Sequence, residues 1–188
     1  LAGFDTPPRL APALRGTTTP AVEVTGDATT RNAGYAEAYL ELDGEASERL
    51  AVFARQERVT VNTLVQAAWA LLLQRYTSQD TVAFGATVAG RPDDLPSAQQ
   101  LLGLFINTLP VIASPRASLP VGDWLRAMQA QALASREHEH TPLNEIQRWA
   151  GAGGEALFDS LIVFENYPVD AALKAGAPGG LQVRDVSS

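Results

Sequence analysis

The chain contains no cysteine among its 188 residues. This absence excludes a disulfide framework, a zinc site built from thiolates and a cysteine nucleophile, and it is compatible with a reducing compartment. Long apolar runs are also missing. The longest, residues 64–73, is interrupted by Gln66 and falls short of the ~20 residues that a membrane span needs. We therefore expect no transmembrane helix.

Positive charge is scarce as well, with 14 Lys and Arg against 21 Asp and Glu and a formal net charge of -7. Such a surface repels phosphate backbones and anionic lipid, so nucleic acid is not an expected partner. The first residues have neither the basic start nor the apolar core of a secretory signal, which favours a cytoplasmic location. Because residue 1 is Leu rather than Met, we also expect the sequence to be part of a longer protein.

The usual signatures of catalysis are absent too. No serine lies in a Gly-x-Ser-x-Gly turn, so a hydrolase triad is not expected. The glycine-rich residues 151–154 precede an apolar segment instead of a helix, which is not the geometry of a phosphate-binding loop. Asp159 and Glu165 lie six residues apart in a predicted strand. Since this places them about 20 Å apart, they do not form an acid–base pair.

Two histidines, His138 and His140, are the only side chains that ordinarily exchange protons near neutral pH. With one residue between them they do not share a helical face, whereas in a strand both could bind one metal ion. No cysteine and no dense group of carboxylates surrounds them. The pattern therefore favours a solvated junction between two helices, and we predict neither a metal site nor a catalytic residue in this chain.

Apolar periodicity predicts eight secondary-structure elements. Strands are predicted at residues 35–42, 81–88, 105–113 and 156–166, and helices at residues 44–58, 61–76, 121–137 and 142–149. This order predicts an α/β fold, a layered sandwich in which helices pack on a mixed sheet. The proline-rich residues 1–34 are interpreted as an extended linker or, equally well, as a disordered tail.

The predicted helix 61–76 is apolar on nearly every side, and Thr60 suits its N-cap because a hydroxyl accepts a hydrogen bond from a free amide of the first turn. A helix without a polar face is typical of a position between two layers. We therefore expect this helix to be buried on all sides.

Asn107 stands within an apolar predicted strand, between Ile106 and Leu109. Burying an unpaired amide costs on the order of 1–3 kcal/mol, so this side chain is expected either to pair with the backbone or to face a polar cavity. Residue type alone favours pairing with the backbone. Arg91 follows Gly90 on a loop that leaves a predicted strand, and residue type alone favours a surface cation, for which Asp93 and Asp94 are candidate partners of little energetic weight.

Three short motifs carry a resemblance to a known family. Residues 88–92 read Val-Ala-Gly-Arg-Pro, residues 103–110 read Gly-Leu-Phe-Ile-Asn-Thr-Leu-Pro, and residues 138–143 read His-Glu-His-Thr-Pro-Leu. Together they resemble the later core motifs of condensation domains of nonribosomal peptide synthetases. Residues 158–168 resemble the last core strand of that family, although the Arg-Asp-x-Ser-Arg that often precedes it is missing. The His-His-x-x-x-Asp-Gly motif that carries the family's chemistry occurs nowhere in the sequence.

The resemblance implies the carboxy-terminal lobe of a chloramphenicol-acetyltransferase-like pair, whose active site lies between two lobes. It divides the chain into an inter-lobe linker (1–34), the lobe (35–170) and a Gly- and Ala-rich tail (171–188). It implies that Asn107, Thr108, Gly90 and Arg91 lie at the substrate tunnel. The amino-terminal lobe and acidic carrier proteins are the implied partners.

The implied function is a part in peptide-bond formation between aminoacyl or peptidyl thioesters carried on phosphopantetheine, with no cofactor bound directly. The isolated chain is expected to be inactive. Alternatives are a lobe of an epimerization or heterocyclization domain, a coenzyme A-dependent acetyltransferase of the same fold, and a non-catalytic module that docks carrier proteins.

Overall fold

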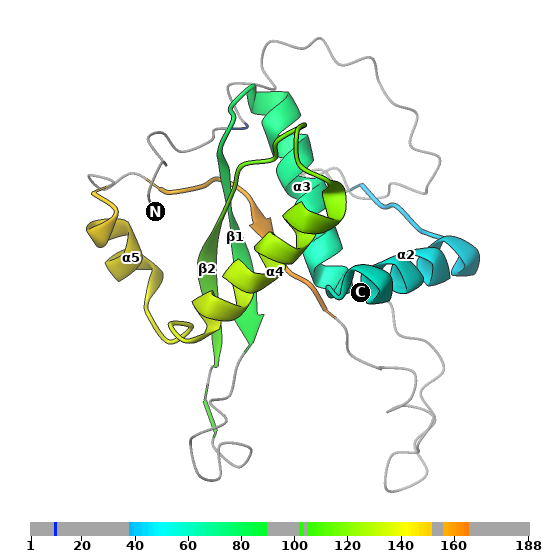
Figure 1. Ribbon diagram of the computed structural model, residues 1–188. Helices are drawn as coiled ribbons and strands as arrows, with labels where there is room; N and C mark the ends of the chain where they lie inside the picture. Colours follow the sequence, from blue (N-terminus) through cyan, green and yellow to red (C-terminus); the bar gives the residue numbers. More distant parts are fainter. Residues whose placement is uncertain (1–9, 11–37, 90–101, 104, 152–155, 166–188) are drawn as a thin grey trace, which may run out of the picture.

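The computed structural model describes residues 10, 38–89, 102–103, 105–151 and 156–165. Helices α2 (Gly44–Glu57) and α3 (Val61–Thr77) come first, followed by strands β1 (Val82–Ala89) and β2 (Ile106–Ala113). Helices α4 (Val121–Arg136) and α5 (Leu143–Trp149) and the short strand β3 (Leu161–Ile162) complete the order. In Figure 1, α4 crosses the sheet, while α2 and α5 lie at opposite sides of it.

The sheet has three strands in the order β2-β1-β3, with β1 in the centre. Strands β1 and β2 pair antiparallel along their full length, from Val82 opposite Ala113 to Ala89 opposite Ile106. Strand β3 runs parallel to β1 and pairs with it only at Gly85 and Ala86. The sheet is therefore mixed, and the α/β prediction is confirmed.

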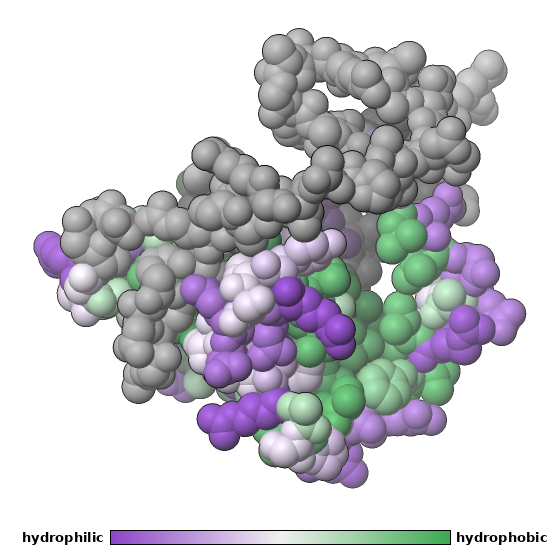
Figure 2. Space-filling view, turned by 90° about the horizontal axis from the view of Figure 1, so that it is seen from above, coloured by the Kyte–Doolittle hydropathy of each residue, from purple (hydrophilic) through white to green (hydrophobic). Residues whose placement is uncertain are grey.

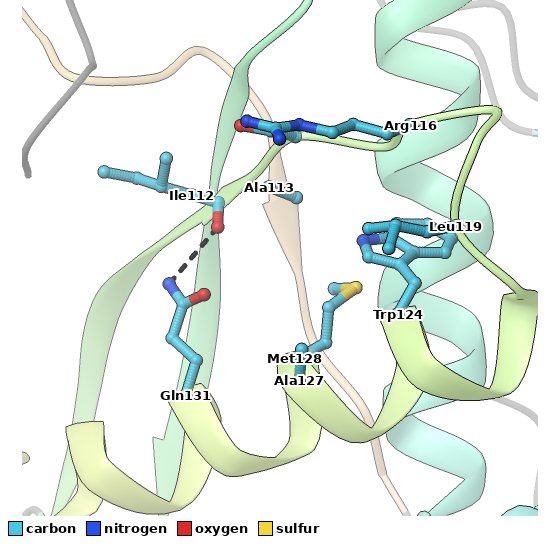
Figure 3. A pocket seen from close by; sticks show the side chains of 9 residues that line it. Ile112, Ala113, Arg116, Leu119, Trp124, Ala127, Met128 and Gln131 are labelled. Carbon is cyan, nitrogen blue, oxygen red and sulfur yellow. Dashed lines mark hydrogen bonds between the residues drawn. The ribbon is translucent and has the colours of Figure 1, made fainter.

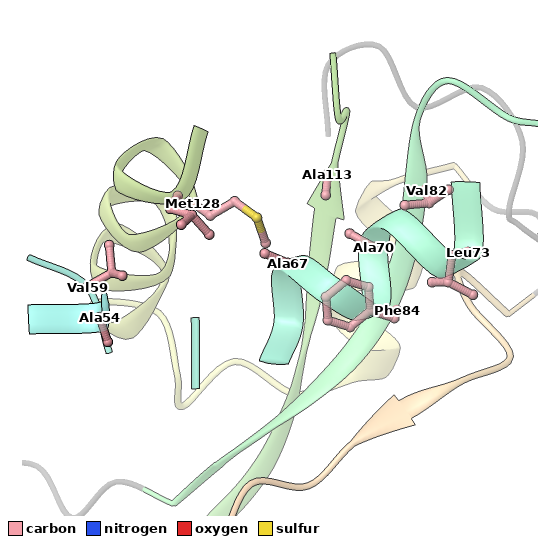
Figure 4. Close-up of a cluster of buried hydrophobic side chains, with 10 residues drawn as sticks. Ala54, Val59, Ala67, Ala70, Leu73, Val82, Phe84, Ala113 and Met128 are labelled. Atoms are coloured by element: carbon pink, nitrogen blue, oxygen red, sulfur yellow. The ribbon is translucent and has the colours of Figure 1, made fainter. Parts of the chain in front are cut away.

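A single core forms where α3 and α4 pack against one face of the sheet (Figure 4). Residues directly opposite in an antiparallel pair share a face, so Val82, Phe84 and their β2 partners face the helices together. Phe84 and Val82 are fully buried, as is Leu73 of α3. Met128 of α4 joins the same cluster, as an unbranched side chain that fills irregular gaps.

The helix boundaries follow capping chemistry. Thr60 caps α3, because its hydroxyl accepts a hydrogen bond from the amide of Thr63 at 3.1 Å, as predicted. Asp43 caps α2 in the same way through Ala46. Arg58 ends α2 in the left-handed region with φ of 58°. Both caps satisfy amide groups that the first turn of a helix leaves unpaired.

One ion-pair network joins α2 to α4. Arg126 donates to Glu57 Oε2 at 2.5 Å and to Asp123 Oδ1 at 2.6 Å. The hydrogen bond to Asp123, followed by that to Glu57, raises the pKa of Arg126 above its ordinary value. Arg126 therefore stays cationic, although an exposed pair of this kind contributes little to stability.

The predicted strand 35–42 is wrong for residues 38–42, the part of it that the structure describes. Residues 38–42 have no regular structure, and Tyr39 and Leu40 are 77% and 89% exposed. A strand is stable only when a neighbour completes its hydrogen bonds, and no strand of the described part pairs with this segment. Residues 35–37 lie outside the described part of the chain.

The predicted strand 156–166 is also much shorter than expected, since only Leu161 and Ile162 form β3. The preceding residues pack by side chain instead, with Leu157 buried and the Phe158 ring lying against Gly85 of β1. The backbone pairing with β1 is limited to the residues beyond that ring. The Trp69 indole donates to Ser160 Oγ at 3.3 Å, which ties this segment to α3.

Helix α3 is buried on one face only, contrary to the expectation for a helix between two layers. Its outer face carries Val65, Leu72 and Tyr76, which are 42%, 46% and 56% exposed. Figure 2 shows apolar surface among polar side chains on the side of the molecule where α2 lies. Among the described residues, no second layer covers this face of α3.

Several predicted features lie outside the described residues. They include most of the linker 1–34, the tail 171–188, Gly90 and Arg91. Leu10 is described: it packs against the core, and its amide donates to Asp159 Oδ2 at 2.7 Å. Within the described ranges, none of the helices has the length and apolar character of a membrane span.

Candidate functional site

The described structure contains a cavity of about 700 Å³. It lies between the first turns of α3, the last turns of α4, the paired ends of β1 and β2, and residues 163–165. Leu109, Met128 and Leu133 give it apolar walls. Its size falls within the range of ordinary ligand sites, so we treat it as the candidate functional site.

One wall of this cavity is a network of uncharged polar side chains from α3 and α4. Gln129 Oε1 accepts hydrogen bonds from the Thr63 hydroxyl at 2.6 Å and from the Thr60 amide at 3.0 Å. Thr63 is 5% exposed, so these bonds compensate for the burial of its hydroxyl. The network fixes the start of α3 against α4.

Gln66 extends this polar wall by one helical turn. Its Nε2 donates to Asn62 Oδ1 at 3.1 Å, a pairing that the i, i+4 spacing on α3 allows. Gln66 is 9% exposed and lines the cavity. The wall thus presents amide and hydroxyl groups to whatever occupies the space.

Asn107 lies beside the cavity and binds the turn between α4 and α5. Its Nδ2 donates to the carbonyl oxygens of Glu139 at 2.7 Å and Thr141 at 2.8 Å, and its Oδ1 accepts from the Thr108 amide at 2.8 Å. The expected backbone pairing is therefore confirmed. These bonds join the motif 103–110 to the motif 138–143.

Three charged residues are among those that line the cavity: Arg136 at the end of α4, Glu139 in the turn that follows, and Glu165 after β3. None of them forms an ion pair within the described ranges of the chain. Glu139 is half-buried, whereas Arg136 and Glu165 are exposed. The lining therefore includes two acidic residues and one basic residue.

A second hollow of about 410 Å³ lies at the other end of β2 (Figure 3). Leu119, Trp124 and Met128 line it, and Arg116 lies along one side. Gln131 donates to the Ile112 carbonyl at 3.2 Å on the side away from Trp124. This hollow contains none of the motif residues, so it is secondary to the larger cavity.

The two histidines lie in the turn between α4 and α5, and both are exposed. This is the helix junction that the sequence predicted. Within the described ranges there is no group of three His, Cys, Asp or Glu that would hold a metal ion.

The predicted tunnel residues are only partly brought together. Asn107 and Thr108 are neighbours in β2 on opposite faces of the sheet, and their neighbours Ile106 and Leu109 line the cavity in their place. Gly90 and Arg91 lie outside the described residues. A role of these four residues at a substrate tunnel stays a prediction.

Sequence reasoning missed Gln129, Thr63 and Glu139. Gln129 is on α4, and its partners Thr60 and Thr63 are at the start of α3. No local sequence pattern reveals a contact across 66 to 69 residues. Glu139 did have a signal, since it lies inside the motif 138–143. Its position suggested only a solvated junction.

Comparison with known proteins identifies related chains. Residues 16–182 match the model of the condensation domain family. The chain is 48% identical over 155 residues to a linear gramicidin synthase of Brevibacillus parabrevis, covering 82% of the chain and 3% of that synthase. It is 47% identical over 133 residues to chondramide synthase of Chondromyces crocatus, covering 70% of the chain and 3% of the relative. The chain thus spans only a small part of the length of these relatives.

Solved structures show the same fold at lower identity. A four-domain nonribosomal peptide synthetase bound to AMP and glycine is similar with a TM-score of 0.60 and 20% identity, covering 68% of this chain and 10% of that one. The first condensation domain of the calcium-dependent antibiotic synthetase, in complex with a substrate analogue, has a TM-score of 0.52 and 19% identity, covering 63% and 25%. The predicted fold, one lobe of a chloramphenicol-acetyltransferase-like domain, is confirmed.

Proposed function

The chain belongs to the condensation domain family, and from this premise we propose that it forms part of a domain that makes peptide bonds in nonribosomal peptide synthesis. The match over residues 16–182 is the observation that carries this proposal. The structure supports it, because Asn107 joins two of the motifs that carry the resemblance at the edge of the 700 Å³ cavity.

The proposed reaction joins two thioesters, each held by the phosphopantetheine arm of a carrier protein. The amine of the acceptor attacks the carbonyl carbon of the donor thioester, so that a C–N bond forms, the C–S bond breaks and the amine loses a proton. Negative charge develops on the carbonyl oxygen in the transition state, and an acid–base group takes up the proton. The sequence lacks the His-His-x-x-x-Asp-Gly motif, and we propose that this group lies in the amino-terminal lobe.

This lobe contributes binding surface to the reaction. The polar wall formed by Thr63, Gln66 and Gln129 offers hydrogen bonds that suit the amide groups of a pantetheine arm, and Leu109 and Met128 offer apolar surface. Asn107, Thr108, Gly90 and Arg91 are proposed to lie where the two substrates meet. Carrier proteins and the amino-terminal lobe are the proposed partners, and the cytoplasm is the proposed location.

Reconstitution tests this function. The intact two-lobe domain that contains this chain is expected to form an amide from a carrier-bound donor and a carrier-bound acceptor, detected by mass spectrometry of the acceptor carrier. The isolated chain is expected to form none above the uncatalysed rate, because it lacks the base.

Two results would contradict the proposal. An intact domain that binds both carriers yet makes no amide would argue against peptide-bond formation. Amide formation by the isolated chain at an enzymatic rate would show that the base lies within these 188 residues.

A further inference from the structure

We propose that Glu139 recognises an alkylammonium group of the substrate, and that Asn107 is the positioning residue that holds Glu139 in place. The inference rests on the proposed function, because it assigns a substrate group to the cavity of the same lobe. It also makes a binding prediction that does not depend on catalysis.

The position of Glu139 is fixed on both sides of its backbone. Its carbonyl oxygen accepts from Asn107 Nδ2 at 2.7 Å, and its amide donates to the Arg136 carbonyl at 3.2 Å. Its side chain has no hydrogen-bond or ion-pair partner in the described part of the chain, although the residue is half-buried and lines the cavity. A carboxylate in this setting keeps its hydration until a ligand arrives.

A ligand that displaces this water must replace its hydrogen bonds. Leaving a carboxylate unpaired in a filled cavity is costly, so the occupant must bring a donor, and a cationic donor gives the strongest hydrogen bond. The other charged groups of the wall are Arg136 and Glu165. Together the three give the cavity a net negative charge, which favours a cation over an anion.

Asn107 acts through the turn and not on the substrate. Both hydrogens of its amide are directed to carbonyl oxygens, one of Glu139 and one of Thr141. Neither is left to bind a substrate group. Removing the amide would free the turn, so that Glu139 would lose its fixed position while keeping its charge.

An alkylammonium could come from two parts of an acceptor, the α-amine or a basic side chain. The test measures KM and kcat of the intact two-lobe domain with norvalyl and ornithyl acceptors on the same carrier, at a constant donor. Glu139→Gln is expected to raise KM about tenfold with little change in kcat, as for a lost charge-assisted contact in a cavity open to water. A rise for both acceptors identifies the α-amine, and a rise for the ornithyl acceptor alone identifies the side chain. An unchanged KM for both would overturn the proposal.

Three variants make the result specific. Glu137→Gln removes an exposed carboxylate two residues away that does not line the cavity, and it should leave KM unchanged. Arg136→Gln removes the opposing charge and should lower KM. Asn107→Ala should raise KM for the same acceptor as Glu139→Gln, and the double variant should add little because both changes act on one contact. A fully additive double variant would remove Asn107 from the proposal.

Direct binding separates this inference from the proposed function. Nuclear magnetic resonance titration of the intact domain with n-butylammonium should shift amide signals around the cavity, and n-butanol at the same concentration should not. Glu139→Gln should abolish the ammonium response. If the domain binds n-butylammonium through Glu139 but forms no amide, the proposed function fails and the ammonium site stands. If the domain forms amide but Glu139→Gln does not change its response to n-butylammonium, or there is no response at all, the ammonium site fails.

Discussion

Asn107 shows how one side chain connects parts of the chain that are 32 and 34 residues apart in sequence. It stands in a strand, where the backbone is already paired, so its side chain is available for a second set of bonds. The carbonyl oxygens of Glu139 and Thr141 lie in the turn between α4 and α5, outside both helices, so they have no intrahelical partner. An amide with two donors at this position meets both needs.

Replacing this amide should therefore weaken the fold locally without abolishing it. Asn107→Ala is expected to lower the free energy of unfolding of the chain by about 1–3 kcal/mol, because two carbonyl oxygens lose their donors. Asn107→Asp should cost at least as much, because its carboxylate oxygen faces the same carbonyls. Urea denaturation followed by circular dichroism measures both.

The matched control is Asn144→Ala, since Asn144 is an exposed asparagine on α5. It should change the free energy of unfolding by less than about 0.5 kcal/mol. In the intact domain, Asn107→Ala should also reduce condensation or alter acceptor preference while unfolding stays cooperative. Equal stability of the Asn107→Ala and Asn144→Ala variants would show that the amide contributes nothing to the turn.

For single residues, the sequence predicted the kind of interaction that a side chain makes better than it predicted the partner. An amide within an apolar run indicated a backbone bond, and Asn107 makes one because an unpaired amide would be costly. The sequence did not predict that the partner is the motif 138–143, since no spacing rule links a strand to a turn 32 residues later. Gln129 was missed for the same reason. Its role depends on hydrogen bonds from Thr60 and Thr63, which are distant in the sequence.

Among the elements, β3 depends on a close approach at Gly85. A methyl group at this position would lie 2.6 Å from Cε2 of the Phe158 ring and 2.9 Å from Cδ1 of Leu161. The Gly85 amide also donates to the Ser160 carbonyl at 2.9 Å. Glycine is therefore required because the segment before β3 lies directly on the strand.

Gly85→Ala should separate this segment from the sheet. We expect a loss of about 1–3 kcal/mol in the free energy of unfolding, the usual cost of inserting a methyl group into a closed contact. Gly44→Ala is the matched control, because nothing lies within 4 Å of a methyl group there and Gly44 begins α2. That change should be neutral or stabilise by about 0.5 kcal/mol.

Hydrogen exchange of the backbone amide at position 85 reports on the same contact. It should accelerate in the Gly85→Ala variant relative to wild type and remain unchanged in the Gly44→Ala variant. If Gly85→Ala unfolded at the wild-type urea concentration, the Phe158 contact would not be what holds β3.

Element type was predictable where the pattern is periodic and the partner is near. Helices α2 to α5 and strands β1 and β2 were all predicted within a few residues. Helices α2 to α4 and both strands contribute side chains to the core cluster, whereas α5 has no buried residue. Residues 38–42 and 156–160 have strand-like composition but no ladder. Composition reports what a segment is able to bury, whereas a strand also needs an edge to pair with.

Considered as a whole, the described structure has its core on one face of a three-stranded sheet. The core side chains of α3 and α4 are almost fully covered, while the outer face of α3 is apolar and open. The adjacent residues Leu72 and Leu73 show the contrast, with 46% and 1% of their surface exposed. Since both are leucines in one helix, a difference in stability between their alanine variants reports the difference in burial.

This pair gives a prediction for the whole molecule. Leu73→Ala should lower the free energy of unfolding of the 188-residue chain by about 2–5 kcal/mol, the cost of a cavity in the core. Leu72→Ala should lower it by only about 1 kcal/mol, because 46% of the Leu72 surface is already exposed and alanine is as good a helix former. Urea denaturation of both variants measures the difference.

The exposed apolar face of α3 should also bind a hydrophobic dye. Anilinonaphthalene sulfonate is expected to bind the isolated chain at the outer face of α3, and Leu72→Gln should reduce its fluorescence, because exposed apolar patches mark surfaces that bind apolar groups. In the intact two-lobe domain the same dye should bind more weakly if the rest of the domain covers α3. Equal losses of stability from Leu72→Ala and Leu73→Ala would mean that α3 is buried on both faces in solution, and the sequence-based expectation of a helix between two layers would then hold for the isolated chain.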